Sequence, residues 1–298
     1  MAYRSWSHRP VCGRVPAVTA PAGSGQAANP IDGSGSDRAR CVLAPNPGLM
    51  TLDGTNTWLV AEPDSATAVV IDPGPKDEGH LRRIVEVAAE RGQRISEIVL
   101  THRHDDHSEG APRLAELTGA GVRALDPAHR LGSEGLAAGD VIDSSGCELR
   151  VMITPGHTSD SVCLHLVADN VVLTGDTVLG RGTAVIADDG SLSEYLASLR
   201  ELRALTEETG LSSLLPGHGP LLASPERVLD FYLRHRAERL DEVRAALAAG
   251  DRTPAAIVER VYIDVDRALW RSAQVSVRAQ LRYLRDQGEL PPGVSFER

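Results

Sequence analysis

Three histidines and two aspartates lie within the six residues from 102 to 107, in the order His-Arg-His-Asp-Asp-His. The preceding segment, Ile95–Leu100, is typical of a short buried strand, so the polar residues begin where that strand ends. Alternate side chains of an extended backbone share a face and adjacent ones diverge, so this one segment can supply two neighbouring metal positions. Neutral imidazole and carboxylate groups together suit zinc or a similar divalent ion of the first transition row.

Further candidate ligands follow in glycine- or threonine-rich turns, each behind an apolar, strand-like segment: His157, Asp176 and His218. Glycine lets backbone approach a ligand closely, and loops at strand ends commonly carry function on a rigid scaffold. The alternative, a chance cluster in a solvated loop, is disfavoured by this recurrence. Asp72 also ends an apolar segment. We expect it to hydrogen-bond a metal-binding histidine, with a purely turn-forming role as the alternative.

The combination of these motifs resembles the metallo-β-lactamase superfamily of hydrolases over about residues 45 to 225. The resemblance implies two metal positions and an aspartate that bridges them. True β-lactamases of this superfamily typically have another residue, often Cys, at the bridging position, so the aspartate points to glyoxalase-II-like and RNase-Z-like hydrolases. By the resemblance, the first metal is bound by His102, His104 and His157, the second by Asp106, His107 and His218, and the bridge is Asp176.

A narrower resemblance, carried by residues 46–58, 175–183 and 216–220, is to the β-lactamase-like-protein-2 subfamily. Its animal members are implied to be mitochondrial endoribonucleases acting on single-stranded RNA. Fungal relatives with similar motifs release polyketides from carrier proteins as thioesterases. The expected protein is therefore a dinuclear metal-dependent hydrolase, in which metal-bound hydroxide attacks an ester centre and Asp106 orients the nucleophile.

We expect single-stranded RNA to be the substrate, with thioesters of an acyl carrier protein or coenzyme A as the alternative. A non-catalytic scaffold that keeps its metals for structure is disfavoured because all seven ligand positions are intact. The expected cofactors are two divalent metal ions, zinc first, with manganese or iron as alternatives.

Composition limits the partners. The formal net charge of −10 argues against a protein that coats duplex DNA, but a metal site supplies its own positive field at a reacting phosphate. No run of 18 apolar residues is present, so we expect no membrane partner. Four cysteines without CxxC spacing and the lack of an apolar signal segment favour the cytoplasm.

The chain divides into three parts. Residues 1–38, rich in Gly, Ala, Ser and Pro, are expected to be a flexible N-terminal segment. Residues 39–225 alternate strands with helices and predict an α/β catalytic domain, the four-layer αββα sandwich that the resemblance also implies. Residues 226–298 predict a C-terminal helical, winged-helix-like module.

Apolar spacing and breaker residues set the expected elements. Ser193 is the expected N-cap of the helix over 193–208, and residues 288–293 could form a short hairpin or wing. The predicted strands cover 40–44, 57–61, 68–71, 98–100, 122–125, 149–153, 162–167 and 171–173, and the predicted helices cover 77–91, 109–118, 193–208, 225–249, 253–262 and 268–287.

The arginines of the last helix allow two interpretations. In the first, the module only packs against the core or a sister subunit, which permits a homodimer. In the second, it uses its arginines, at positions 271, 278, 282 and 285, to line a channel for nucleic acid or substrate.

Overall fold

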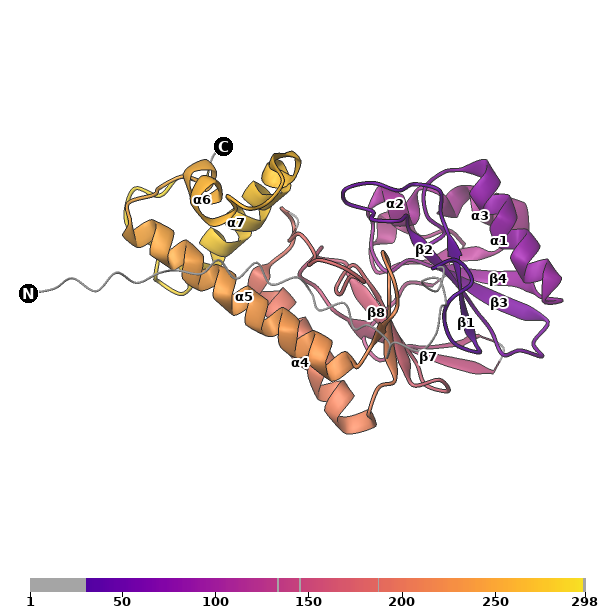
Figure 1. Ribbon diagram of the computed structural model, residues 1–298. Helices are drawn as coiled ribbons and strands as arrows, with labels where there is room; N and C mark the ends of the chain where they lie inside the picture. Colours follow the sequence, from indigo (N-terminus) through magenta and orange to yellow (C-terminus); the bar gives the residue numbers. More distant parts are fainter. Residues whose placement is uncertain (1–30, 133, 145, 187, 297–298) are drawn as a thin grey trace, which may run out of the picture.

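The computed structural model describes residues 31–132, 134–144, 146–186 and 188–296, which form two β-sheets, flanking helices and a C-terminal helical module (Figure 1). Most of the segment predicted to be flexible, residues 1–30, lies outside the described residues. The remainder of it, residues 31–38, packs on the sandwich. Asp32 Oδ1 accepts a hydrogen bond from the Leu43 amide at 3.0 Å, and Arg38 pairs with Asp169 at 2.6 Å. The structure therefore corrects the predicted end of the flexible segment.

The first sheet has its strands in chain order, β1-β2-β3-β4-β5. The first three strands pair antiparallel, and the last three pair parallel. The strands are β1 (Ala39–Leu43), β2 (Asn56–Val60), β3 (Thr67–Ile71), β4 (Arg94–Val99) and β5 (Gly121–Arg123).

The second sheet has the order β11-β10-β9-β8-β7-β6, with a parallel pair only between β9 and β10 among the described strands. The strands are β6 (Val141–Ser144), β7 (Cys147–Ile153), β8 (Val162–Leu166), β9 (Val171–Gly175), β10 (Ser213–Pro216) and β11 (Leu222–Ala223).

Three clusters of buried apolar side chains define the layers. The central cluster joins Trp58 and Val99 of the first sheet to Leu149 and Leu173 of the second, so the sheets pack face to face. A second cluster lies between the outer face of the first sheet and α1 (Glu78–Glu90) and α3 (Ala111–Thr118). The third lies between the second sheet and α4 (Leu192–Thr209) and α5 (Pro225–Ala248). The predicted αββα sandwich is confirmed.

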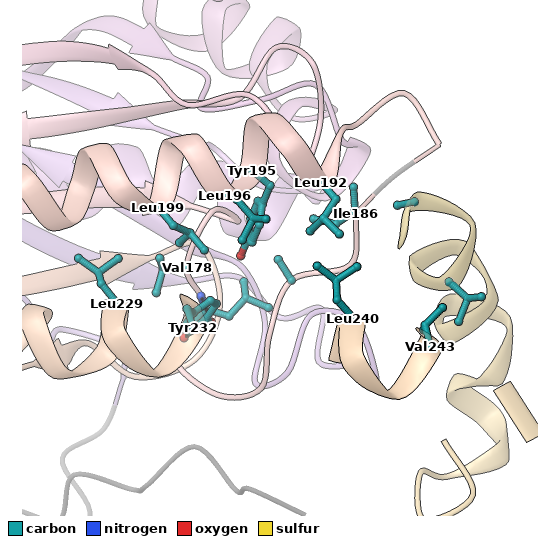
Figure 2. Packing of buried hydrophobic residues seen from close by; sticks show 14 of the residues in the cluster. Val178, Ile186, Leu192, Tyr195, Leu196, Leu199, Leu229, Tyr232, Leu240 and Val243 are labelled. Carbon is teal, nitrogen blue, oxygen red and sulfur yellow. Dashed lines mark hydrogen bonds between the residues drawn. The ribbon is translucent and has the colours of Figure 1, made fainter. Parts of the chain in front are cut away.

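The helical module follows without a break in packing. Helix α5 runs out of the sandwich alongside α4 and carries α6 (Pro254–Val261) and α7 (Trp270–Asp286) at its far end (Figure 1). Buried residues of α4, α5, α6 and α7 belong to one apolar cluster. Within it, Tyr195 and Tyr232 pack between α4 and α5 (Figure 2). The Tyr232 hydroxyl accepts from the Leu179 amide at 2.9 Å and donates to the Gly182 carbonyl at 3.0 Å.

Two local predictions are wrong. The N-cap of α4 is Ser191, whose side chain accepts from the Glu194 amide; it lies two residues earlier than the expected Ser193, because Leu192 is part of the helix and is buried against the core. Residues 289–296 contain turn and coil and no strand. The adjacent prolines 291 and 292 lack the N–H donors that a paired wing would need. Two 3-10 turns, Pro127–His129 and Arg267–Leu269, and the short helix α2 (Asp105–Ser108) complete the elements.

No helix in the described ranges has both the length and the apolar composition needed to cross a membrane.

Candidate metal centre

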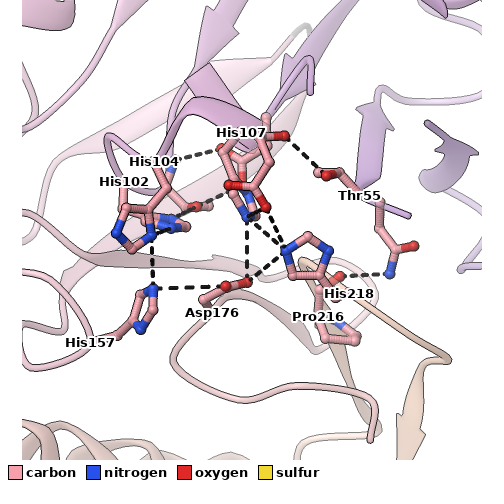
Figure 3. A network of polar contacts seen from close by, with 12 residues as sticks. Thr55, His102, His104, His107, His157, Asp176, Pro216 and His218 are labelled. Atoms are coloured by element: carbon pink, nitrogen blue, oxygen red, sulfur yellow. Dashed lines mark hydrogen bonds and ion pairs between the residues drawn. The ribbon is translucent and has the colours of Figure 1, made fainter. Parts of the chain in front are cut away.

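The seven predicted ligands converge at one end of the sandwich, where loops from both sheets meet (Figure 3). His102 and His104 follow β4, and Asp106 and His107 lie in α2, which begins one residue after His104. The other three come from the second sheet, in loops that follow β7, β9 and β10: His157, Asp176 and His218.

The first group consists of three histidines. His102 Nε2 lies 3.0 Å from His104 Nδ1, and His157 Nε2 lies 3.1 Å from the same atom. His102 and His157 are buried, at 2% and 6% exposure, and His104 is half-buried, so the group has one side open towards solvent. An open side is what a catalytic metal site needs and a structural site lacks.

The second group contains a carboxylate and two histidines. His107 Nε2 and His218 Nε2 are 3.1 Å apart, and Asp106 Oδ2 lies 3.1 Å from the His218 nitrogen. Both imidazoles are fully buried, whereas the Asp106 side chain is 31% exposed. Asp106 is therefore the member of this group that an incoming substrate or water can reach.

Asp176 lies between the two groups. Its Oδ2 is 3.7 Å from His157 Nε2, and its Oδ1 is 3.5 Å from His107 Nε2 and 3.6 Å from His218 Nε2. The Oδ1 atom is buried and has no hydrogen-bond partner among the described residues. A buried carboxylate oxygen without a donor is costly, and a cation on each side of the carboxylate would remove that cost.

Outer hydrogen bonds determine which nitrogen of each ring faces inward. His107 Nδ1 donates to Asp72 Oδ2 at 2.8 Å. The Thr101 hydroxyl donates to the same oxygen at 2.6 Å, so Thr101 Oγ1 can only accept from His102 Nδ1, which lies 3.0 Å away. Asp72 is 1% exposed and also accepts from the Thr101 amide at 2.7 Å. Both rings therefore carry their proton on the outer nitrogen.

Backbone carbonyls orient two further rings. His157 Nδ1 donates to the Val185 carbonyl at 2.6 Å, and His218 Nδ1 donates to the Gly54 carbonyl at 3.1 Å. The inward nitrogen of each ring, Nε2, lies 3.1 Å from a nitrogen of a neighbouring imidazole, His104 Nδ1 for His157 and His107 Nε2 for His218. Such a donor set fits divalent cations and has no other ready partner.

The charge of the site leads to the same conclusion. Burial lowers the pKa of His107, but the carboxylates of Asp176, Asp72 and Asp106 outweigh burial and raise that pKa to about 10. Burial raises the pKa of the Asp106 carboxyl, but His218 and His107 outweigh it and hold that pKa well below its usual range. Without metal, His107 thus keeps a proton that balances the carboxylates; divalent cations would replace that positive charge.

The first residue of β2 and the residue before it support the second group. Thr55 Oγ1 donates to the Asp106 carbonyl at 3.0 Å, and Asn56 Nδ2 donates to the Pro216 and Gly219 carbonyls at 2.9 and 2.8 Å. Because these carbonyls flank His218, Asn56 holds the turn that presents this ring. The sequence run Thr55-Asn56-Thr57 is compatible with such a role and equally with a turn-forming one.

Comparison with known proteins identifies the family. The family model described as the metallo-beta-lactamase superfamily matches residues 50–218, more than half of the chain. The chain belongs to the metallo-beta-lactamase superfamily. Superfamily members typically bind divalent metals, and the homologues support a metal-dependent hydrolase here. A second model, the beta-lactamase associated winged helix domain, matches residues 253–289 and confirms the predicted winged-helix-like module.

Curated relatives of this superfamily cover most of the chain. An atrochrysone carboxyl ACP thioesterase from Aspergillus fumigatus is 33% identical over 76% of this chain and 74% of its own length. A beta-lactamase-like protein 2 homolog from Caenorhabditis elegans is 30% identical over 85% of this chain and 86% of its own.

Solved structures share the fold. A beta-lactamase domain protein from Burkholderia ambifaria superposes with a TM-score of 0.72 at 23% identity, covering 87% of this chain and 90% of its own. A metallo-beta-lactamase family protein from Thermus thermophilus superposes with a TM-score of 0.70 at 20% identity, covering 84% of this chain and 94% of its own.

Proposed function

We propose that this metal-dependent hydrolase acts on acyl thioesters and that its two metal positions hold zinc. The observation that carries the proposal is the loop that leads into the metal centre, Asn46–Gly54. Its Leu49 and Met50 side chains are 62% and 50% exposed, although they lie only a few residues from Gly54, whose carbonyl holds His218. Exposed large apolar side chains beside a reaction centre suit an apolar acyl group better than a polyanion.

The arginines of α7 add a second argument. Arg278 and Arg282 pair with Asp188 at 3.2 and 3.8 Å, and Arg285 pairs with the adjacent Asp286 at 2.9 Å. Each of these guanidinium groups has a carboxylate beside it, which offsets its attraction for a phosphate. The net charge of −10 points in the same direction. These observations reverse the order of preference that the sequence alone suggested.

The chemistry is hydrolysis of the C–S bond of a thioester. Bound divalent cations would supply Lewis acidity, which lowers the pKa of a water and stabilises negative charge that develops on oxygen. Asp106 is ionised and partly exposed, so its carboxylate would orient the attacking water and accept its proton. Water adds to the acyl carbon, the thiolate leaves with a proton, and the products are a carboxylic acid and a thiol.

A test would use purified holoprotein and a panel of acyl-coenzyme A and short pantetheine thioesters, with free thiol detected by a chromogenic reagent. The matched control is Asp106→Ala combined with His107→Ala. Thiol release that depends on metal and is absent from the control supports the proposal. No release from any acyl chain length by fully metallated protein would refute it.

Single-stranded RNA is the second candidate, favoured by exposed residues at the start of α7 and in the 3-10 turn before it. Arg267 and Arg271 are exposed and form no ion pair with a described residue, and Arg267 stacks over Trp270 at 5.2 Å. Arginine and an aromatic ring together can stack on unpaired bases. The Ser272 hydroxyl lies 3.6 Å from Met50 Sδ, so this end of α7 borders the same loop. Cleavage of end-labelled RNA by wild type and not by the control would establish this candidate.

A further inference from the structure

The segment Ala184–Asp189, in which residue 187 is not described, contacts the metal centre through two of its residues. The Val185 carbonyl accepts from His157 Nδ1 at 2.6 Å. Asp189 pairs with Arg103, the residue between His102 and His104, at 2.5 Å. The segment thus contacts the His157 ring directly, and it contacts His102 and His104 through Arg103, the residue between them.

The same segment is held from the other side by the helical module. Arg236 of α5 donates from Nη2 to the Ala184 carbonyl at 2.5 Å. Arg278 and Arg282 of α7 pair with Asp188. The Asp188 side chain is 63% exposed, so these two pairs are screened by solvent and contribute little. The contact from Arg236 is the buried one.

Arg236 is an unusual residue to find in this place. It is 4% exposed, its guanidinium lies over the Tyr195 ring at 4.8 Å, and it forms no ion pair with a described carboxylate. Its Nε atom has no hydrogen-bond partner in the described part of the chain. Burial of a cation without a counter-ion is unfavourable, so stability alone would favour an apolar residue here. The hydrogen bond to the Ala184 carbonyl and the contact with Tyr195 are the interactions that an apolar residue could not make.

Tyr195 provides a second connection to the same ligand. The ring that Arg236 covers belongs to a residue whose backbone packs directly against Gly156, the neighbour of His157. A Cβ atom on Gly156 would lie 2.3 Å from Tyr195 Cα, so no side chain fits between them. Arg236 therefore contacts structure on both sides of His157, at Ala184 and at Tyr195.

We propose that Arg236 is a positioning residue for the first metal position. It fixes the Ala184 carbonyl, and the next carbonyl, that of Val185, then holds the His157 ring with Nε2 towards His104. In this way the helical module stabilises one metal position of the sandwich. The proposal concerns the metal centre alone and stands or falls separately from the identity of the ester that is cleaved.

The first experiment measures stepwise zinc affinities by competition with a chromogenic chelator for Arg236→Met, which keeps the apolar stem and removes the donor and the charge. The affinity of the first position is expected to fall, by at most the about 10- to 100-fold that follows loss of a ligand's own outer hydrogen bond, because Arg236 acts on His157 through one intervening residue; the second position is expected to be unchanged. Arg236→Lys, which keeps a donor, should recover part of the loss. The matched control is Arg244→Met, because Arg244 lies on the same helix and pairs with Glu289.

A double-mutant comparison assigns the effect to a position. In a His218→Ala background the first position remains, and Arg236→Met should still weaken the remaining zinc. In a His157→Ala background the first position is already lost, and Arg236→Met should have no further effect. Equal weakening in both backgrounds, or an affinity of Arg236→Met equal to that of wild type and Arg244→Met, would overturn the proposal.

Discussion

Replacement of Asp72 by asparagine is expected to weaken both metal positions, although Asp72 itself faces neither. Its carboxylate accepts from His107 Nδ1, from the Thr101 hydroxyl and from the Thr101 amide, at 2.6 to 2.8 Å. An amide of the same shape offers one oxygen and one NH₂ group. If the oxygen keeps the Thr101 amide, the NH₂ group must face His107 Nδ1 and the Thr101 hydroxyl.

In this arrangement the ring protons of His107 and His102 move from the outer to the inner nitrogen. His107 Nδ1 can accept from the new NH₂ group only if its proton moves to Nε2, the nitrogen that faces the second metal position. Thr101 Oγ1 likewise becomes an acceptor from the amide and donates to His102 Nδ1, which moves the His102 proton to the nitrogen facing the first position. Each metal loses one lone-pair ligand or must displace a proton to regain it. We expect about a 10- to 100-fold loss of affinity at each position, or about 1.4–2.7 kcal/mol.

The assay is chelator competition with zinc on metal-free Asp72→Asn and on Thr101→Val. The threonine variant removes the hydroxyl that accepts from His102 Nδ1 and donates to Asp72 Oδ2, but leaves Asp72 to accept from His107 Nδ1, so it should weaken the first position more than the second. Thermal unfolding in the presence of a chelator separates loss of affinity from loss of fold. If Asp72→Asn binds both metals within about twofold of wild type, the reasoning from proton positions is refuted.

Three further predictions follow from the same contacts. Gly217→Ala would place a Cβ 2.7 Å from His107 Cε1 and 2.8 Å from Asp176 Oδ1, so we expect loss of metal from the second position with unchanged far-UV circular dichroism; normal stoichiometry would contradict this. Asn56→Ala removes two buried hydrogen bonds and should lower the free energy of unfolding by about 1–3 kcal/mol in urea titrations of metal-free protein. Burial, with Arg236 and Arg239 nearby, lowers the pKa of His235 to about 4, so only the unfolded state takes up the proton as pH falls below about 6.5. Stability should therefore decline from about pH 6.5 to about pH 4 by about 2–3 kcal/mol, and His235→Gln should flatten that decline in unfolding curves across this range.

The sequence was sufficient to predict the layers and to select the residues that converge. Apolar runs between glycine-rich turns mark β2, β3, β7, β8 and β9 to within two residues, because strands buried on both faces have a continuous apolar composition. The dense motif at 102–107 and the isolated residues in turns are chemically distinctive. Neither kind of signal specifies how strands pair, and the short strands β6 and β11 carry too few apolar residues to be noticed.

The supports of the ligands were harder to predict. The partner of His157 is the Val185 carbonyl, and a backbone carbonyl leaves no mark in a sequence. Arg236, in contrast, can be recognised in the sequence. It lies four residues after Tyr232 and four before Leu240, on the buried stripe of α5, where an apolar residue is expected. A charged residue on an otherwise apolar helical face is therefore a signal that sequence analysis can use to find positioning residues.

The position of Arg236 in α5 connects the helical module to the metal centre. The sandwich supplies all seven candidate ligands, yet the loop that orients His157 is fixed by a guanidinium from α5. The same module borders the Leu49–Met50 loop through Ser272. A change in the packing of α5 and α7 would therefore act on the first metal position and on the exposed apolar loop together.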